Sequence, residues 1–129
     1  MSAKTRQQFF VCKHCGNIVG MVFNAGVSVV CCGEKMQEME PNTVDAAHEK
    51  HLPVIDSVGE RRIVNVGEVD HPMAAEHFIE WIYVETERGG QRKCLSPGEK
   101  PNLTFIMDDD KPIAVYSYCN LHGLWKTEL

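Results

Sequence analysis

Four of the six cysteines of this 129-residue chain lie in one short segment near its beginning. Two residues separate Cys12 from Cys15, fifteen residues separate Cys15 from Cys31, and Cys31 and Cys32 are adjacent. Apolar runs separated by turn residues predict a compact β unit over residues 8–32. A unit of fewer than about 40 residues rarely buries enough apolar surface to fold alone and usually needs a metal or disulfides. We therefore expect a small first domain, residues 1–38, held together by its cysteines.

The spacing of these cysteines favours a metal site. A C-x-x-C turn directs two sulfurs at one ion, and the adjacent pair Cys31-Cys32 supplies two more. Four thiolates in a tetrahedron bind zinc or iron. Two disulfides are the alternative, which is uncommon where a cytosol keeps thiols reduced. Adjacent cysteines have to splay to reach one ion, which would distort the tetrahedron, and the spacing alone leaves zinc and iron open.

The rest of the chain, residues 39–129, predicts an antiparallel β-sandwich, so the expected fold class is all-β. A polar connector at residues 33–42 precedes it, and Thr43 suits the cap of a single helical turn. Strand-like runs then alternate with turn signals, including a hairpin turn expected at Gly89-Gly90. The runs cover residues 62–66, 77–86, 91–95, 103–107 and 113–118.

Cys119 and His122 form a C-x-x-H pair just after the last of these runs. The pair is weak evidence by itself, because a structural cysteine near a surface histidine gives the same pattern. Three further histidines, His51, His71 and His77, lie at or near predicted strand ends or loops, so one end of a sandwich can bring all five residues together. Four neutral imidazoles and one thiolate suit iron, copper or zinc, and they leave an octahedral metal one open position. An open position implies chemistry, because structural metal sites are closed.

Charge and composition narrow the classes of function. The formal net charge is −5 and the basic residues are scattered singly, which argues against a nucleic-acid binder. No apolar run approaches the ~18 residues that a membrane span needs. The first eight residues contain no apolar core of a secretory signal, so we expect a cytoplasmic protein.

A series of motifs runs along nearly the whole chain: Cys12-x-x-Cys15, Cys31-Cys32, Thr43-Val-Asp-Ala-Ala, Glu49-Lys-His51-x-Pro-Val, Val66-Gly67, His71-Pro-Met73 with His77, and Cys119-Asn-x-His122-Gly-x-Trp125. In this order they resemble desulfoferrodoxin, the two-iron superoxide reductase of class I, which joins a desulforedoxin-like to a neelaredoxin-like domain. The resemblance implies an immunoglobulin-like sandwich for the second domain, a homodimer, and a rubredoxin-like external electron donor.

The resemblance also implies two iron sites. The first is a distorted rubredoxin-like Fe(Cys)4 centre, which would be held by Cys12, Cys15, Cys31 and Cys32. The second is the catalytic iron, which would have four equatorial imidazoles and one axial thiolate, supplied by His51, His71, His77, His122 and Cys119.

The implied reaction is the one-electron reduction of superoxide to hydrogen peroxide, which detoxifies superoxide. Superoxide is an anion, so a chain of net charge −5 needs a local cation to reverse the field at the site. By the resemblance, Lys50 has this attracting role and orients water for proton delivery, and Glu49 occupies the open position when the iron is oxidised and substrate is absent. By pattern alone, both are ordinary surface residues.

Two other functions fit parts of the pattern. A non-catalytic iron or zinc protein would act as an electron carrier through the cysteine cluster alone, and a dismutase would release oxygen as well as peroxide. Three residues fit no ligand role. Cys94 is expected to be a half-buried small residue, His48 a loop residue, and His14 a solvent-facing residue between two ligands.

Overall fold

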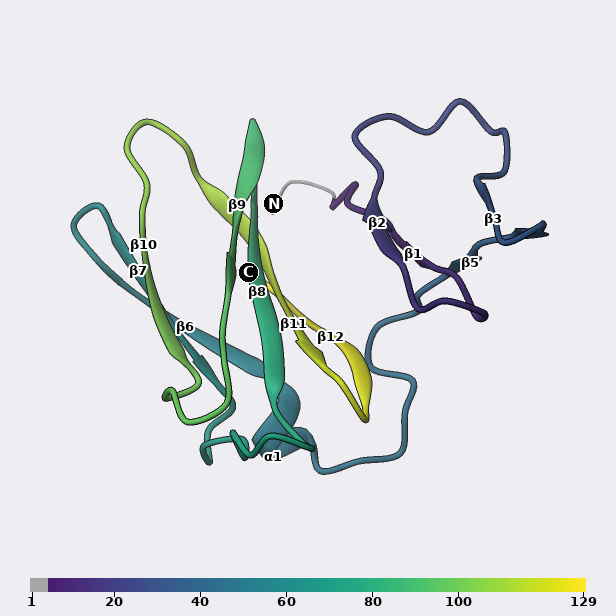
Figure 1. Cartoon of the computed structure of the whole chain (residues 1–129). Helices are drawn as coiled ribbons and strands as arrows, with labels where there is room; N and C mark the ends of the chain where they lie inside the picture. Colours follow the sequence, from purple (N-terminus) through teal and green to yellow (C-terminus); the bar gives the residue numbers. More distant parts are fainter. Residues whose placement is uncertain (1–4) are drawn as a thin grey trace. The chain divides into compact units, whose positions relative to one another are not determined.

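The computed structural model describes residues 5–129. The chain divides into two compact units, Arg6–Glu40 and Pro41–Leu129, which run from purple to blue and from blue to yellow in Figure 1. Both units are built from antiparallel strands, which confirms the all-β class. No helix in the described part of the chain is long and apolar enough to cross a membrane.

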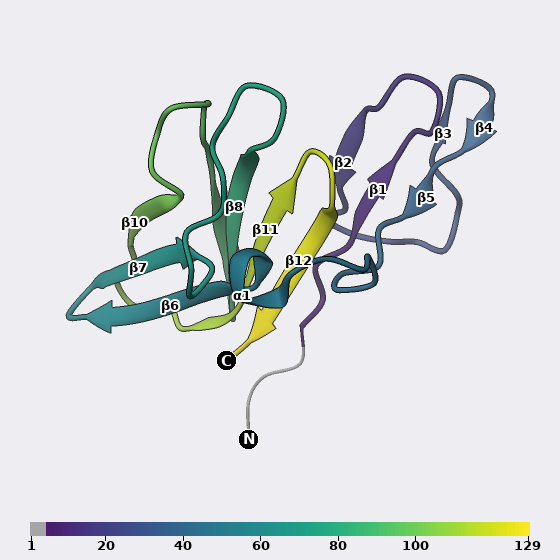
Figure 2. The same cartoon turned by 90° about the horizontal axis from the view of Figure 1, so that it is seen from below.

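The Arg6–Glu40 unit contains five short strands in two small sheets. In the first sheet β1 (Phe9–Val11) lies between β2 (Ile18–Gly20) and β5 (Gln37–Glu38), and in the second β3 (Val30–Cys31) pairs with β4 (Glu34–Lys35) (Figure 2). Residues 34–38 were expected in a polar connector, which is wrong because they pair with β3 and β1. The buried apolar residues of this unit are Phe9, Cys12 and Met36. So small a core agrees with a unit that needs a further source of stability.

The Pro41–Leu129 unit is a sandwich of two antiparallel sheets. The three-stranded sheet has the order β10-β7-β6, and its strands are β10 (Asn102–Ile106), β7 (Arg61–Val66) and β6 (Pro53–Val58). The four-stranded sheet has the order β12-β11-β8-β9, and its strands are β12 (Gly123–Glu128), β11 (Pro112–Cys119), β8 (Ile79–Thr86) and β9 (Gly89–Cys94). Seven strands in this arrangement form the expected immunoglobulin-like sandwich.

The core of the sandwich lies between the two sheets. Val64 and Val66 of β7 and Phe105 of β10 pack with Ile82 of β8 and Val115 of β11, and all five are fully buried. Alternate residues of each strand face this core, which is why the strands show alternating apolar positions in the sequence. The core also reaches Cys119 at the end of β11, so one candidate ligand stands on a rigid element.

Two expected local features are wrong. The β8–β9 turn is made by Glu87 and Arg88, because Gly89 and Gly90 already pair with Thr86 and Glu85 in the ladder. Gly90 is needed there because a side chain at this position would run into the Tyr83 ring. The single helical turn is α1 (His48–His51), preceded by Ala47 with no side-chain cap, and Thr43 lies outside it.

Two strands of the sandwich, β6 and β12, were not predicted from the sequence. β6 is an edge strand with mostly exposed side chains, so it shows little apolar alternation. β12 begins directly after the Cys119–His122 turn, and its first residue, Gly123, has φ 77°.

Candidate metal centres

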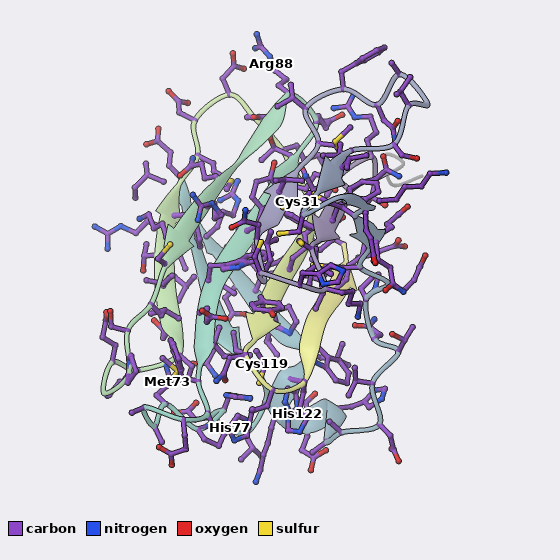
Figure 3. The ribbon with its side chains drawn as sticks, turned by 45° about the vertical axis from the view of Figure 1, so that its right-hand side comes forward. Cys31, Met73, His77, Arg88, Cys119 and His122 are labelled. Carbon is purple, nitrogen blue, oxygen red and sulfur yellow. The ribbon has the colours of Figure 1, made fainter. Side chains whose placement is uncertain are left out.

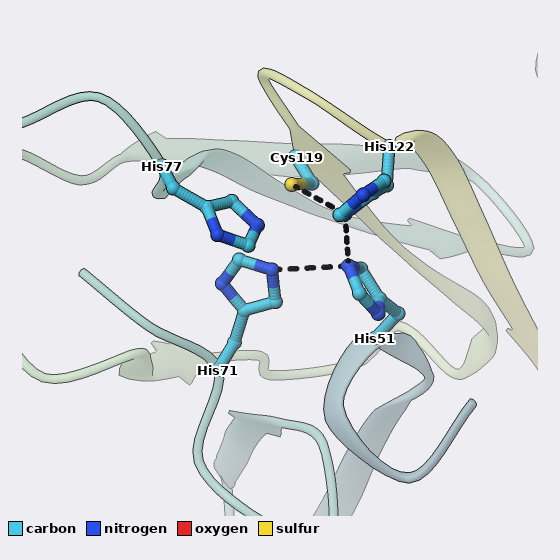
Figure 4. A group of neighbouring side chains, drawn as sticks. All are labelled: His51, His71, His77, Cys119 and His122. Atoms are coloured by element: carbon cyan, nitrogen blue, oxygen red, sulfur yellow. Dashed lines mark hydrogen bonds between the residues drawn. The ribbon is translucent and has the colours of Figure 1, made fainter. Parts of the chain in front are cut away.

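One end of the sandwich gathers five donor side chains from separate segments (Figure 4). His51 ends α1, His71 and His77 lie between β7 and β8, Cys119 ends β11, and His122 lies in the turn before β12. One ligand atom from each residue lies within 4.8 Å of the others. The structure therefore brings together the whole predicted set.

The four imidazoles form a closed ring in the order His51, His71, His77, His122. Neighbouring ring centroids are 4.6, 4.7, 5.1 and 4.9 Å apart and their planes cross at 78–82°, whereas His51 and His77 lie 6.5 Å apart across the ring. Metal–nitrogen bonds of about 2.1 Å at right angles place neighbouring nitrogens about 3.0 Å apart. The separation is 3.0 Å between His51 Nε2 and His122 Nδ1 and 3.1 Å between His71 Nε2 and His51 Nε2. The ring thus has the dimensions of a four-nitrogen metal plane.

Backbone hydrogen bonds show which nitrogens of two rings are left without a proton. His51 Nδ1 lies 2.7 Å from the Ala47 carbonyl oxygen, and His71 Nδ1 lies 2.7 Å from the Pro72 carbonyl oxygen. Each Nδ1 therefore carries the proton of its neutral ring, and the two Nε2 lone pairs face each other at 3.1 Å. His77 Nε2 is buried without a hydrogen-bond partner among residues 5–129. A cation at the centre of the ring satisfies all three atoms, so the residues fit a metal.

Burial favours the neutral form of His51, His71 and His77. Desolvation lowers the pKa of His51, of His77 and of His71, the last to about 4. A neutral imidazole is the form that binds metals. Burial also raises the pKa of the Cys119 thiol, and the N–H groups of Leu121 and His122 oppose that rise. The sulfur lies 3.9 Å from His122 Nδ1, beside the ring, where a metal cation would favour the thiolate.

Trp125 and Ser117 support the ligand rings from β12 and β11. The fully buried Trp125 stacks on His51 at 4.9 Å between centroids, and its Nε1–H donates to the His122 carbonyl oxygen at 3.1 Å. The buried Ser117 hydroxyl donates to the His51 carbonyl oxygen at 3.0 Å. The sequence assigns no role to Ser117, whose partner lies 66 positions away in the chain.

Glu49 and Lys50 lie in α1 beside His51, with exposed side chains that are not among the five donors. Their charges nevertheless act on the rings. Burial is the largest effect on both pKa values and lowers them. The Lys50 charge adds a smaller lowering of the pKa of His77, and the Glu49 charge slightly raises the pKa of His51. The Val69 N–H donates to the Glu49 carbonyl oxygen at 2.9 Å, and Gly67 packs so closely there that any side chain would meet the same carbonyl.

The second donor group consists of the four predicted cysteines of the small unit, with ligand atoms again within 4.8 Å of one another: Cys12, Cys15, Cys31 and Cys32. Sulfur atoms, yellow in Figure 3, gather beside the labelled Cys31. Metal–sulfur bonds of about 2.3 Å give a tetrahedron with edges of about 3.8 Å. The Cys15 and Cys31 sulfurs are 3.6 Å apart, and those of Cys31 and Cys32 are 4.0 Å apart. Cys32 adopts φ 52°, a left-handed backbone that lets the adjacent pair splay toward one point.

The pKa values of this group also favour a cation. A hydrogen bond from the Cys15 N–H, the largest effect, lowers the pKa of Cys12 to about 6. Hydrogen bonding with Cys15 is the largest effect that raises the pKa of Cys32 to about 12. Neighbouring thiols thus resist ionising together, and a cation among them removes that conflict. One further residue reaches the group, since Asn17 Nδ2 donates to the Cys31 sulfur at 3.7 Å.

Family comparisons agree with both donor groups. The model of the desulfoferrodoxin N-terminal domain matches residues 4–39, and that of desulfoferrodoxin matches residues 43–128. The chain belongs to the desulfoferrodoxin family. It is 46% identical to the desulfoferrodoxin of Syntrophotalea carbinolica over 94% of this chain and 95% of that protein. The four-cysteine and four-histidine–cysteine groups match the two iron sites of this family, which confirms the predicted resemblance and cofactors.

Solved structures lead to the same family. The superoxide reductase of Treponema pallidum superposes with a TM-score of 0.81 at 39% identity, covering 96% of this chain and 100% of that one. A superoxide reductase from Giardia intestinalis, described as 1Fe-SOR, has a TM-score of 0.52 at 29% identity and covers 63% of this chain and 99% of its own.

Three of the cysteines and histidines, Cys94, His48 and His14, lie outside both donor groups. Cys94 is exposed, so the expected half-buried position is wrong, and its sulfur accepts from Arg92 Nη1 at 3.3 Å. His48 is the first residue of α1 and meets the Trp125 ring edge-on at 5.2 Å. His14 is exposed as expected and forms an ion pair with Glu34 at 3.1 Å when protonated.

Proposed function

We propose that this protein is a superoxide reductase that converts superoxide to hydrogen peroxide at an iron held by His51, His71, His77, His122 and Cys119. The observation that carries the proposal is the ring of four imidazoles, with two lone pairs confronted at 3.1 Å, in a chain of the desulfoferrodoxin family. Each turnover takes one superoxide, one electron and two protons, and it forms one hydrogen peroxide.

Iron held by these five residues would supply the electron and an open position for superoxide. The residues of the chain set the conditions there. The imidazoles add no charge, and the Cys119 thiolate adds one negative charge in a buried position. The N–H groups of Leu121 and His122 stabilise the charge on the sulfur and moderate its donation to the metal.

Lys50 is proposed to attract superoxide and to orient water for proton delivery. Its position beside His51 in α1 supports this role, because a chain whose net charge is −5 needs a local cation to attract an anion. Glu49 is proposed to occupy the open position in the oxidised enzyme without substrate. The Val69–Glu49 hydrogen bond supports this role, because it holds the backbone of α1 against the β7–β8 loop.

The two units are proposed to divide the work, with residues 1–38 as the Fe(Cys)4 domain that stores or relays an electron and residues 39–129 as the catalytic domain. The Giardia relative supports this division, because a protein described as one-iron matches only 63% of this chain. A rubredoxin-like protein is proposed as the electron donor, and detoxification of superoxide as the role in the cell. Six free cysteines support a reducing compartment such as the cytoplasm.

A homodimer is also proposed for the assembled protein. The small unit exposes Val22, Phe23 and Val27 at 103%, 80% and 77% of their full surface. Several large apolar side chains exposed within one small unit are consistent with a protein contact. Sedimentation of the parent and of Phe23→Ser tests the idea, since a parent that sediments as a monomer would contradict it.

Metal analysis and stopped-flow superoxide consumption test the enzymatic proposal. The expected protein holds two irons and forms peroxide with one donor electron per superoxide. Cys119→Ser is expected to lose superoxide reduction and the cysteine-to-iron charge-transfer band while keeping the bands of the four-cysteine centre. Cys94→Ser, the matched control at an exposed thiol, is expected to retain all of these properties. Oxygen release without electron consumption would indicate a dismutase, and iron–thiolate bands without superoxide consumption would indicate an electron carrier.

A further inference from the structure

His77 differs from the two buried ligand candidates in how its ring is held. The rings of His51 and His71 are oriented by hydrogen bonds from Nδ1 to backbone carbonyls. Within residues 5–129, the His77 ring makes no hydrogen bond, and its Nε2 is buried without a partner. The position of this imidazole must therefore be set through its backbone.

The backbone around His77 is tied on one side to its own loop. His77 and Ala74 exchange two backbone hydrogen bonds of 3.0 and 3.1 Å. The Ile79 N–H points to the Met73 sulfur at 3.4 Å, and Figure 3 shows Met73 at the same end of the sandwich as His77. These contacts shape the loop, but they do not join it to the strand that carries Cys119.

Asn120 makes that connection through three hydrogen bonds. Its side-chain Oδ1 accepts from the Phe78 N–H at 2.9 Å, and its Nδ2 donates to the Glu76 carbonyl oxygen at 3.0 Å. Its backbone N–H donates to the Phe78 carbonyl oxygen at 3.2 Å. The bonded residues, Glu76 and Phe78, are the two neighbours of His77. The hydrogen bonds of Asn120 therefore hold the peptide segment on both sides of the ligand.

The sheet register explains why a side chain is needed here. The β8–β11 ladder pairs Tyr118 with Trp81 and then Cys119 with Ile79, so it shifts by one residue just before the site. Beyond this irregularity the backbones of the two segments are joined by the bond from the Asn120 N–H to the Phe78 carbonyl oxygen. The Asn120 side-chain amide offers both a donor and an acceptor, and it adds two further bonds between the segments.

We propose that Asn120 is a positioning residue that holds the His77 imidazole at a fixed distance from the Cys119 sulfur and so sets the geometry of the catalytic iron. It touches neither substrate nor metal. The inference rests on the proposed function in one respect only, which is that these five residues bind iron.

Gln91 offers a control away from the donor ring. Its side-chain Nε2 donates to the Ile106 carbonyl oxygen at 2.8 Å, so it also joins two strands through a side-chain amide. Neither of these strands, β9 and β10, carries a ligand candidate. Gln91→Ala therefore removes a side-chain bond between strands without changing a segment that holds a ligand.

The experiment uses the iron-loaded full chain and compares the parent, Asn120→Ala and Gln91→Ala. Asn120→Ala is expected to shift or broaden the cysteine-to-iron charge-transfer band, to change the electron paramagnetic resonance of that iron, and to release iron to a chelator about tenfold faster. The bands of the four-cysteine centre serve as an internal standard and are expected to stay constant. Gln91→Ala is expected to match the parent in all of these signals.

Asn120→Asp provides a second arm in case the alanine variant does not fold. It keeps the acceptor for the Phe78 N–H and loses the donor to the Glu76 carbonyl, so its iron signals are expected to lie between those of the parent and Asn120→Ala. Iron signals that change equally in Asn120→Ala and Gln91→Ala, or that stay at parental values in Asn120→Asp, would overturn the inference. A parent without any charge-transfer band would instead refute the proposed function.

Discussion

Replacing Trp125 by phenylalanine tests how far one side chain supports the ligand ring. The indole is fully buried, stacks on His51 at 4.9 Å, and donates to the His122 carbonyl oxygen at 3.1 Å. Phenylalanine keeps a ring in the stack but loses the N–H donor and part of the packed surface. Trp125→Phe is therefore expected to weaken both the fold and the site.

The size of the effect follows from these contacts. The lost hydrogen bond contributes about 1 kcal/mol. The smaller ring removes roughly 50 Å² of buried apolar surface, or about 1.3 kcal/mol at about 25 cal/mol per Å². With a small cavity added, the free energy of unfolding should fall by roughly 2–3 kcal/mol, which lowers the melting temperature of a domain of this size by roughly 10–20 °C.

Urea unfolding followed by circular dichroism in the presence of a chelator measures this loss without a contribution from metal binding. The iron-loaded variant should also show a shifted charge-transfer band, because the ring under His51 has changed. Trp81→Phe is the control, since Trp81 stacks on Tyr118 at 5.5 Å. A loss below about 0.5 kcal/mol, typical of a surface position, would refute the reasoning.

Three further predictions concern charge, redox potential and pH. Lys50→Ala should slow the bimolecular reaction with superoxide by roughly tenfold at low salt and weaken the salt dependence of its rate. Lys35→Ala makes the same change in net charge and should have neither effect. Equal effects of the two variants would reject local steering. Asn17→Ala should lower the reduction potential of the four-cysteine centre, because the hydrogen bond to the Cys31 sulfur stabilises the more negative, reduced state. A potentiometric titration that gives the parental potential would contradict this. The metal-free protein should lose stability as the pH falls from about 6.5 to about 4. Over that range the unfolded chain takes up a proton at His71, whereas burial lowers the pKa of His71 in the folded chain to about 4. Urea midpoints that stay level over this range would argue against the shift.

Much of the site was predictable because its residue types are rare and their chemistry is narrow. Cys12, Cys15, Cys31 and Cys32 lie close together in the chain, so a local turn pattern was enough to predict one site. His51, His71, His77 and His122 were predictable as a set only through the motifs around them, since no local spacing links them. The strand-like runs that became β7, β8 and β11 predicted a sandwich because they are rich in apolar residues and separated by turn signals.

Elements with few buried side chains were not predicted from the sequence. β6 lies at a sheet edge with mostly exposed side chains, so its pattern resembles that of a loop. The β8–β9 turn was misplaced because glycine suits both a turn and a strand position under the Tyr83 ring, and only the pairing partner distinguishes the two. The α1 helix begins at His48 without a side-chain cap, which leaves no local signal for its start.

The sequence by itself determined the donor atoms, four thiolates in one unit and four imidazoles with a thiolate in the other, because the side-chain chemistry of cysteine and histidine does not depend on the fold. Only the tertiary structure decided the order of the imidazoles around the ring, the nitrogen that each of His51, His71 and His122 presents to it, and the grip of Asn120 on the segment of His77. These features depend on distances between residues that are tens of positions apart in the chain. The strand pairing of the sandwich sets such distances, and local residue preferences do not.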